Sequence, residues 1–551
     1  MKIRNIFFIL TLGSLVACNS SSELKEIPSI DENALNSISK DNYIEHIKIL
    51  SSDEFEGRMP FTEGEKKTIA YIKDQFEKIG LAPGNNESFF QEVPLVEISS
   101  TPNNTMKIVG DKGNLNLSYL DDYVMGSRRQ NENIEAKDSE LVFAGFGIVA
   151  PEYNWNDYEG LDVKGKTIVV MVNDPGYYNK ELFKGETMTY YGRWTYKFEE
   201  AARQGATGIM IIHDTGAASY GWNVVRSGWS GPQMTLEFED NGASLAAFEG
   251  WFSAESAQKI FELAGVSTDL IEEAKKPGFK PVNLNLKTEA TIKNHIKKDL
   301  SHNVLAKIEG SKRPDEVIIY TAHWDHLGIG EVVDGDSIYN GAIDNATGVA
   351  ALFEIAKALK NAEVKPERTI LFLTVTAEEQ GLLGSEYYAS HPIYPLSKTV
   401  GIINIDALSA GGKTNDISVV GLGQSELEDY AEEFIKAQNR KIAAEANPSA
   451  GYFFRSDHFN FVKKGIPGLF MGSGSELLST DTTQINTRQQ ALEGRYHTVH
   501  DEVDEHWDFE GILADIRLFF DIGYTMSLET TFPQFKAKSE FRDLGEKRLA
   551  K

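Results

Sequence analysis

The chain of 551 residues contains a single cysteine, Cys18, so no disulfide can form within one molecule. Basic residues are also scarce, because 55 Lys and Arg stand against 82 Asp and Glu, which gives a net charge of −27. A nucleic-acid backbone is bound by a basic surface, so this charge argues against nucleic acid as a partner. The hydrophobic fraction of 41% and the aromatic fraction of 11% still predict folded, well-filled cores.

Long apolar runs are missing as well, and the first 17 residues contain a short one. Lys2 and Arg4 precede an apolar run at 6–16, which is too short to span a bilayer and is typical of a secretory signal. No other stretch reaches about 18 apolar residues, so nothing else is expected to span a membrane. Residues 1–17 are therefore interpreted as a signal peptide.

The end of this signal, "LVAC", resembles a bacterial lipoprotein signal, since a small residue precedes Cys18 and the polar tether "NSSSELKE" follows it. The resemblance implies that Cys18 is lipidated and becomes the mature N-terminus. We then expect an exported lipoprotein of a bacterial cell envelope that contacts the membrane only through its lipid anchor. An ordinary cleaved signal with an incidental cysteine is the alternative. The sequence predicts no oligomeric state.

The length predicts two or three domains. Two amphipathic helical patterns joined by a Gly- and Pro-containing loop occupy the segment before residue 99. Short β-like runs follow, and after them comes an alternation of buried strands and helices. The predicted organisation is a tether at 18–40, an N-terminal helical part at 41–99, an inserted β-rich region at 100–295, a catalytic region at 296–530 and a loosely ordered charged tail at 531–551.

Three nearly continuous apolar runs lie at 317–323, 369–375 and 399–406, and helical patterns at 346–359 and 425–438 alternate with them. Strands that are apolar on both faces and alternate with helices indicate a mostly parallel sheet covered on both sides. The predicted fold class is therefore α/β, with a mixed sheet whose centre is parallel, flanked by helices, and with a β-rich insertion.

Potential metal ligands follow each of these apolar runs, at the sheet edge where α/β proteins bind ligands. The motifs are "AHWDH" after the first run, "AEEQG" after the second and "INID" at the end of the third, with "GAIDNATG" and "RYHTVHDEVD" elsewhere. Imidazoles and carboxylates without thiolates suit zinc or a similar divalent ion. The acids outnumber what one ion needs, so two ions about 3.5–4 Å apart are expected.

Glu378 and Glu379 are adjacent and point in different directions, so a division of labour between metal ligand and general base is natural. Asp325 follows His323 by two residues and is placed to orient its imidazole. Taken alone, "EE" is most often a solvated helix start and "DN" a helix cap. Their recurrence at successive strand ends is what predicts a metal site.

In this order the motifs resemble the co-catalytic di-zinc aminopeptidase family, which includes glutamate carboxypeptidase relatives. The resemblance covers most of 301–525 and the helices at 41–82, and it makes the inserted region similar to a protease-associated domain. It implies two Zn²⁺ per chain and peptide substrates. The implied ligands are His323 and Asp406 for one ion, Glu379 and His497 for the other, and Asp344 as the bridge.

The resemblance also implies a general base, Glu378, an orienting role for Asp325, and a hydroxyl from Tyr496 that stabilises the oxyanion. A cis peptide after Asp344 is expected from several relatives. Aromatic residues beside a site are as often packing residues, so the role of Tyr496 has that alternative. "INID" continues here as "ALSAGG", which departs from the family pattern and affects the pocket floor.

The predicted function is that of a zinc-dependent exopeptidase, an aminopeptidase that hydrolyses N-terminal residues of peptides. A carboxypeptidase or glutaminyl cyclase on the same fold is an alternative, and the two-metal ligand set disfavours the cyclase. A non-catalytic binding ectodomain is a second alternative, although no ligand or base is missing. Glu331, Asp334 and Asp336 lie in a loop that could accept a substrate ammonium group, and Arg455 could bind a carboxylate.

Overall fold

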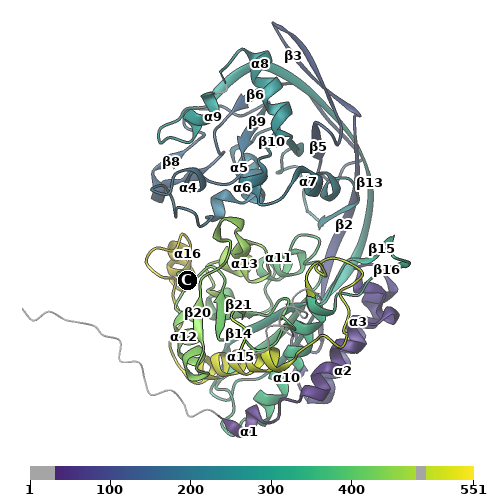
Figure 1. The fold of residues 1–551 in the computed structure, drawn as a ribbon, viewed down its shortest axis with the longest axis vertical. Helices are drawn as coiled ribbons and strands as arrows, with labels where there is room; N and C mark the ends of the chain where they lie inside the picture. Colours follow the sequence, from purple (N-terminus) through teal and green to yellow (C-terminus); the bar gives the residue numbers. More distant parts are fainter. Residues whose placement is uncertain (1–30, 268, 479–491, 551) are drawn as a thin grey trace, which may run out of the picture. The chain divides into compact units, whose positions relative to one another are not determined.

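The three apolar runs of the second half form the parallel centre of a mixed sheet. β14 (Arg313–His323) lies between β17 (Arg368–Val375) and β18 (Thr399–Asn404) and pairs with both in parallel. Every residue of β17 and β18 is buried, which explains their unbroken apolar character. The predicted α/β class with a parallel centre is confirmed (Figure 1).

These coordinates are a computed structural model that describes residues 31–267, 269–478 and 492–550. The predicted signal peptide and Cys18 lie outside the described residues. Over the described ranges, none of the helices combines the length and apolar composition that crossing a bilayer requires.

Helices cover both faces of the central sheet. On one face α10 (Thr347–Asn361) and α15 (Glu510–Leu528) share a core with Ile318 and Tyr320 of β14. The alternate residues of β14 face the opposite side, where Val317 packs with residues from the segments that include α11 (Leu383–Ser390) and α13 (His458–Val462). Successive side chains of a strand point to opposite faces, so this single strand contributes to both cores.

The two predicted N-terminal helices are α2 (Lys40–Leu50) and α3 (Glu63–Ile79), joined through η1 (Asp53–Arg58). Ser39 and Thr62 cap their first turns with side-chain oxygens. Gly80 ends α3 in the left-handed conformation at φ 83°, which a residue without a Cβ adopts freely.

The inserted region has a parallel row of its own. β6 (Asn133–Phe143), β9 (Lys166–Met171), β10 (Gly208–Ile212) and β12 (Phe248–Phe252) pair in parallel in that order. Helix α5 (Trp194–Gln204) follows β9 along the chain, so the region is α/β in its centre and not only β-rich.

One strand runs through the predicted domain boundary at 295 and 296. β13 (Val282–Ile308) pairs with β6 near its start, with β2 (Phe90–Pro102) along its middle, and with β17 at its end, always antiparallel. The side-by-side course of β2 and β13 is visible in Figure 1. The same strand therefore contributes to the sheets of both regions.

The tail is packed, so the prediction of a loosely ordered segment at 531–551 is wrong for its described part. Phe535 and Phe541 are buried, and α16 (Arg542–Leu549) follows them. Arg548 donates hydrogen bonds to the backbone carbonyls of Leu396 and Thr399. The prediction depended on the charged composition of the tail. Burial of its two aromatic side chains stabilises the packed conformation in spite of that composition.

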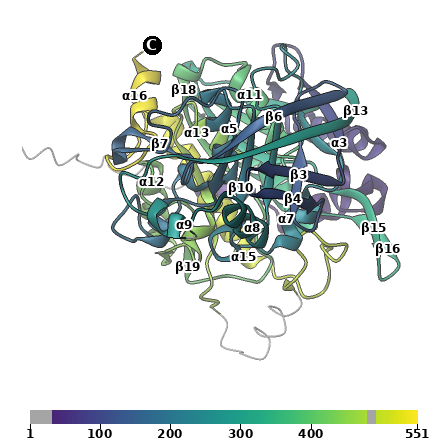
Figure 2. The ribbon, with the colours of Figure 1, turned by 90° about the horizontal axis from the view of Figure 1, so that it is seen from above.

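Smaller elements complete the description. The hairpin of β15 (Gly328–Val333) and β16 (Asp336–Tyr339) stands out from the ribbon in Figure 2. Other elements are β3 (Thr105–Gly110), β4 (Gly113–Ser118), β5 (Tyr123–Gly126), α6 (Thr215–Ala218), α7 (Trp222–Gly228), β11 (Gln233–Leu236), α8 (Ala254–Ala264), β19 (Asp416–Val419), α12 (Leu427–Ala437), β20 (Lys441–Ala443) and β21 (Gly468–Ser473).

Candidate metal centre

The predicted ligands meet at the carboxyl ends of the parallel strands. His323 is the last residue of β14, Glu379 follows β17, and Asp406 follows β18. Asp344 lies in η4 (Ala342–Ala346) directly before α10, and His497 lies in the segment before α15. The fold thus brings together five residues that are spread over some 170 positions of the sequence.

The first group of ligand atoms is compact. The Nε2 atom of His323 lies 3.0 Å from Oδ1 of Asp344 and 3.2 Å from Oδ1 of Asp406. The three side chains offer one imidazole nitrogen and two carboxylate oxygens that lie within 4.8 Å of one another. This spacing suits a single divalent ion.

A second group lies on the other side of Asp344. The Nε2 atom of His497 lies 3.2 Å from Oδ2 of Asp344 and 3.0 Å from Oε2 of Glu379. Asp344 thus presents one oxygen to each group, which is the geometry of a bridging carboxylate. The peptide between Asp344 and Asn345 is cis, as expected.

His326 is a further member that the sequence reasoning left without a role. It is fully buried, and its Nδ1 lies 2.7 Å from Oε1 of Glu379. With Asp344 and Glu379 it forms a second group of metal-ligand type, while its Nε2 has no hydrogen-bond partner. Its place in "AHWDH" was the available signal, but spacing alone could not say which imidazole faces Glu379.

The electrostatics of the centre fit a cation. Burial alone would lower the pKa of His497, but its contacts with Asp344 and Glu379 raise it to about 10. Burial acts in the same direction on His323, and Glu378 and Asp406 raise the pKa of that imidazole well above its usual value. Acids that hold two imidazoles in the charged form would also hold divalent ions, and the donor set of nitrogen and oxygen atoms suits zinc.

Glu378 belongs to neither group of ligands, although its backbone adjoins Glu379. Burial raises the pKa of its carboxyl well above the usual value, and the acids Asp406 and Glu379 add to this effect. A raised pKa beside a metal site is what a group that exchanges protons with substrate requires.

Asp325 acts differently from the expectation. Its carboxylate Oδ1 lies 3.8 Å from Nδ1 of His323, whereas its backbone carbonyl lies 3.0 Å from that nitrogen. The carboxylate instead accepts the backbone N–H groups of Glu378, at 3.0 Å, and Glu379, at 3.3 Å. Asp325 thus holds the imidazole through its main chain and the two glutamates through its side chain.

Tyr496 lies at the rim of the centre. Its ring stacks on the imidazole of His497 at 3.7 Å between centroids, and the residue is 70% exposed. Although the residue is exposed as a whole, desolvation of the hydroxyl raises its pKa, and the carboxylates of Asp344 and Glu379 raise it further. The charge of the acid cluster therefore affects the hydroxyl, while the ring stacking on His497 is a packing contact, so both roles of Tyr496 stay predictions.

Two residues that the sequence analysis did not single out position the ligands. Asp501 accepts hydrogen bonds from the backbone N–H groups of Ile343 and Asp344, which fixes the main chain of the bridging residue. Ser456 donates a hydrogen bond of 2.5 Å to Oδ2 of Asp406. Such contacts orient ligands and commonly affect metal affinity.

Arg58 ties the N-terminal helices to the centre. It is 1% exposed, and it donates hydrogen bonds to the carbonyls of Trp324, Asn340 and Gly341, besides that of Leu50. Burial lowers its pKa to about 10, against the opposing effect of Asp501 and Asp325. One guanidinium thus joins η1 to the two segments that carry His323 and Asp344.

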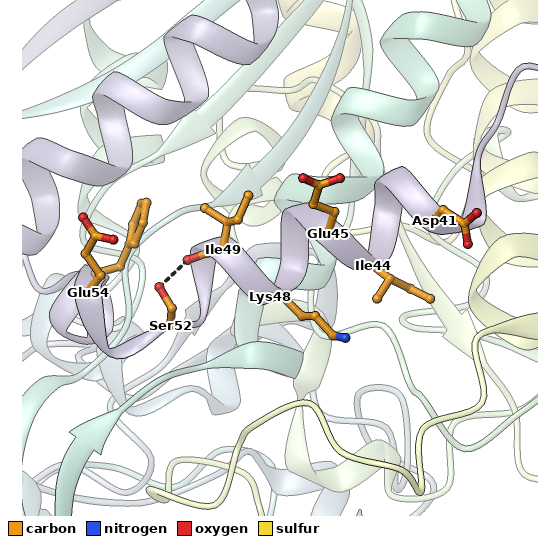
Figure 3. Close-up of a pocket in the computed structure, with 8 residues that line it drawn as sticks. Asp41, Ile44, Glu45, Lys48, Ile49, Ser52 and Glu54 are labelled. Atoms are coloured by element: carbon orange, nitrogen blue, oxygen red, sulfur yellow. Dashed lines mark hydrogen bonds between the residues drawn. The ribbon is translucent and has the colours of Figure 1, made fainter.

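A hollow of about 470 Å³ lies on α2 and η1, away from these ligands. Its lining side chains include Asp41, Glu45, Lys48 and Ile49 (Figure 3). None of the residues of the metal centre lines it, so it is no part of the candidate site.

The acidic hairpin residues stay separate from the ligands. Glu331 and Asp334 are exposed, and Oδ2 of Asp334 lies 3.7 Å from Nε2 of the exposed His500. Neither His500 nor His497 belongs to the two compact groups of three, but His497 lies within 3.2 Å of Asp344 and Glu379.

Fold and site together describe an α/β protein with a candidate centre for divalent ions. Residues 303–518 match the sequence profile of Peptidase family M28. The profile covers every ligand of the metal centre, together with Glu378 and Tyr496.

Curated relatives resemble parts of the chain. A "Probable zinc metalloprotease" of Pyrenophora tritici-repentis is 28% identical over 240 residues, 38% of this chain and 48% of the relative. "Aminopeptidase NAALADL1" of Mus musculus is 33% identical over 138 residues, 24% and 17% of the two chains. "Carboxypeptidase Q" of Xenopus laevis is 26% identical over 232 residues, 42% and 40%. The chain thus spans less than half the length of these relatives.

Among solved structures, the aminopeptidase from Aneurinibacillus sp. strain AM-1 superposes with a TM-score of 0.50 at 20% identity. The superposition covers 90% of this chain and 95% of the other. It supports the common fold of the two proteins.

Proposed function

We propose that the chain is a zinc-dependent exopeptidase, most specifically an aminopeptidase that removes N-terminal residues from peptides. The observation that carries the proposal is the pair of ligand groups that share Asp344. The name of the mouse relative favours an aminopeptidase, and that of the Xenopus relative keeps a carboxypeptidase as the second candidate.

His323 and Asp406 would hold one zinc ion, His497 and Glu379 the other, and Asp344 both. When bound, the ions lower the pKa of a water molecule in the site and polarise the scissile carbonyl. Glu378 accepts the proton of the attacking water. Burial and the neighbouring acids Asp406 and Glu379 raise the pKa of its carboxyl, which favours its taking up a proton.

Glu378 then returns this proton to the amine that leaves, which completes hydrolysis of the peptide bond. Asp325 keeps Glu378 in place through the backbone N–H contact. Tyr496 approaches the developing oxyanion with its hydroxyl and stabilises it by a hydrogen bond.

The experiment combines a substrate panel with metal exchange. Peptides with a free or an acetylated N-terminus, and with a free or an amidated C-terminus, are incubated with the protein before and after chelation. An aminopeptidase cleaves only peptides with a free N-terminus, loses turnover on chelation and regains it with zinc. Cleavage that requires a free C-terminus instead would establish the carboxypeptidase.

Two further assignments depend on sequence alone. The inserted region is proposed as a protease-associated domain, and Cys18 as the site of a lipid anchor in a bacterial envelope. Labelling of the expressed protein with a radioactive fatty acid tests the anchor. A Cys18→Ser variant that stays equally labelled contradicts it.

A further inference from the structure

The hairpin of β15 and β16 has an apolar surface that the rest of the described chain leaves uncovered. Residues 329–335 are all exposed, and they include Ile329 at 62%, Val332 at 66% and Val333 at 38%. The two strands pair with one another and with no other described strand, and the hairpin projects from the body (Figure 2). Apolar side chains on a free two-stranded ribbon suggest an interaction site, because isolated hairpins are marginally stable and exposed apolar patches commonly bind partners.

The base of the hairpin is held in place by η1. Gly57 adopts the left-handed conformation at φ 63°, and a Cβ atom there would lie 2.5 Å from the carbonyl oxygen of Tyr339 and 2.7 Å from that of Gly328. Arg58 donates a hydrogen bond to the carbonyl of Asn340, which follows β16 directly. Close packing and a buried guanidinium therefore anchor both ends of the hairpin, so its apolar surface is presented in a defined position.

The hairpin adjoins the metal centre at both of its ends. β15 begins two residues after His326, and Asp344 follows β16 by five residues. At the turn, Oδ2 of Asp334 lies 3.7 Å from Nε2 of His500, which follows His497 by three residues. An extended chain advances about 3.3 Å per residue, so the exposed segment begins about 10 Å along the chain from His326. A peptide bound at the metals reaches the hairpin with about four residues beyond the scissile bond.

The hairpin carries negative charge as well as apolar surface. Glu331, Asp334 and Asp336 lie on it, and within the described ranges none of them has a lysine or arginine within 4.0 Å. Burial raises the pKa of the nearby Glu502 carboxyl, and the charges of Asp336 and Asp53 raise it further. Like charges that face one another across an interface are destabilising, so a ligand that covers the apolar side chains is expected to bring positive charge.

This charge discriminates between occupants of the surface. A second copy of the chain would bring the same acids to a symmetric contact, where they would repel one another, and an anionic membrane would repel them too. β15 has an outer edge that pairs with no other described strand, and an edge of this kind binds an extended peptide as an additional strand. The occupant that fits is an extended segment in which basic and apolar side chains alternate.

We propose that the β15–β16 hairpin is an exosite, a binding surface outside the catalytic centre, for the downstream part of a long peptide substrate that is rich in basic and apolar residues. The N-terminus of the same peptide lies at the metal centre. Successive side chains of an extended chain point to opposite faces, so apolar residues of the peptide cover Val332 while its basic residues meet Glu331 and Asp334. The inference rests on the proposed exopeptidase function and names a substrate class for it.

The first test measures kcat/KM for two matched decapeptides. Both begin with Ala-Ala-Ala, and from the fourth to the ninth position one alternates Lys with Val and the other Glu with Val. We expect kcat/KM for release of the first alanine to be about tenfold higher for the lysine peptide, because several exposed ion pairs of modest strength add up. The difference should nearly vanish at about 1 M salt, where the Debye length is about 3 Å. Equal values at low salt would overturn the proposal.

Charge reversal on the hairpin assigns this preference to its acids. In the double variant Glu331→Lys/Asp334→Lys the ratio of the two kcat/KM values should invert, so that the glutamate peptide becomes the better substrate. The ratio is measured on one preparation and does not depend on the folded fraction. Glu255→Lys/Glu262→Lys is the control, because it makes the same change of charge at two exposed acids of α8. A ratio that stays unchanged in the hairpin variant, or shifts equally in the control, contradicts the proposal.

A binding measurement separates the exosite from the chemistry. The lysine decapeptide is acetylated at its N-terminus, amidated at its C-terminus and labelled with a fluorophore, and its binding is followed by fluorescence anisotropy. The blocked ends exclude recognition of a terminal ammonium or carboxylate group. Binding that charge reversal weakens about tenfold supports the exosite even if the wild type cleaves no peptide, so the proposed function and this inference fail separately. Equal affinities of the wild type and the reversed variant would overturn the inference.

Val332→Ser tests the apolar part of the surface. It should weaken binding of the lysine–valine peptide about threefold, as partial burial of one valine side chain predicts, and an unchanged affinity contradicts the proposal. Val364→Ser is the control, because this valine lies before β17 and is 54% exposed. Two measurements address the other occupants. A dimer that Val332→Ser dissociates in sedimentation, or binding to phosphatidylglycerol vesicles that it abolishes, would assign the surface to a second copy or to a membrane and overturn the proposal.

Discussion

The peptidase region and the inserted region both gather acids at the carboxyl ends of parallel strands, but they treat the negative charge in opposite ways. In the inserted region Asp174 follows β9, and its carboxylate accepts hydrogen bonds from Gly176 and Thr189. Asp214 follows β10 and accepts from two backbone N–H groups of α6. These acids are satisfied by backbone N–H groups and, for Asp174, also by the hydroxyl of Thr189.

A buried lysine completes the balance in the inserted region. Lys197 is fully buried, donates to the carbonyl of Asn173 at 2.9 Å, and interacts with Asp174 and Asp157. Burial lowers its pKa to about 7, and the two acids oppose that shift. The region thus carries a buried amine of its own near these acids.

The ligand acids of the peptidase region face imidazoles, while the buried Arg58 interacts with Asp344 and Glu379 at longer range. Across the described ranges, no lysine or arginine lies within ion-pair distance of Asp344, Glu379 or Asp406, which face imidazoles instead. Parallel strand ends therefore create a place for charged groups in both regions. Whether such a cluster of acids is structural or binds metal depends on what compensates its negative charge, which is either groups of the protein or a metal ion.

The largest effect expected from this contrast follows the change Glu378→Gln. Removing a general base costs about 10²- to 10⁴-fold in rate, while the ligand groups stay intact. We expect kcat to fall by that factor with metal content unchanged, as measured by steady-state kinetics and elemental analysis. Glu255→Gln, on an exposed residue of α8, serves as the control. Turnover near that of the wild type would remove Glu378 from the role of base.

The matching change in the inserted region is Lys197→Met, which should affect stability and not chemistry. The buried carbonyl of Asn173 loses its donor, and leaving a buried acceptor unsatisfied costs about 1–3 kcal/mol. We expect the free energy of unfolding to fall by about this amount in denaturant titrations, with kcat/KM per folded molecule unchanged. Lys180→Met on the exposed surface is the control. A loss of bound metal in Lys197→Met would break the comparison.

A smaller effect is expected at His326, whose two nitrogens separate positioning from ligation. His326→Asn keeps a donor near the place of Nδ1 and loses Nε2, whereas His326→Leu loses both. If His326 positions Glu379, metal affinity falls about 10- to 100-fold in His326→Leu and much less in His326→Asn. Equal losses in both variants, measured by competition with a chelator, would make His326 a ligand through Nε2.

The smallest effect is expected for Tyr496→Phe. The hydroxyl is one of several groups that can stabilise an oxyanion, and the ring keeps its stacking on His497. We expect kcat to fall less than about tenfold with KM unchanged, since a single exposed hydrogen bond contributes about 1 kcal/mol. An unchanged kcat would leave Tyr496 with a packing role only.

The sequence by itself determined the parallel centre of the sheet and the ligand set at its edge. His323 and Asp406 end two of the apolar runs and Glu379 shortly follows the third, so the local sequence predicts that they lie at strand ends. Asp344 and His497 come from irregular segments, so the residue types of their motifs made them candidates and only the resemblance gave them their roles as ligands.

Only the tertiary structure decided which atoms meet. The carboxylate of Asp325 holds the backbone of Glu378 and Glu379, 53 and 54 residues away, and not the nearby imidazole. His326 faces Glu379, and Arg193 lies beside Arg455. Such contacts join distant segments, and their geometry depends on how the helices and sheets pack, which no local pattern of residues encodes.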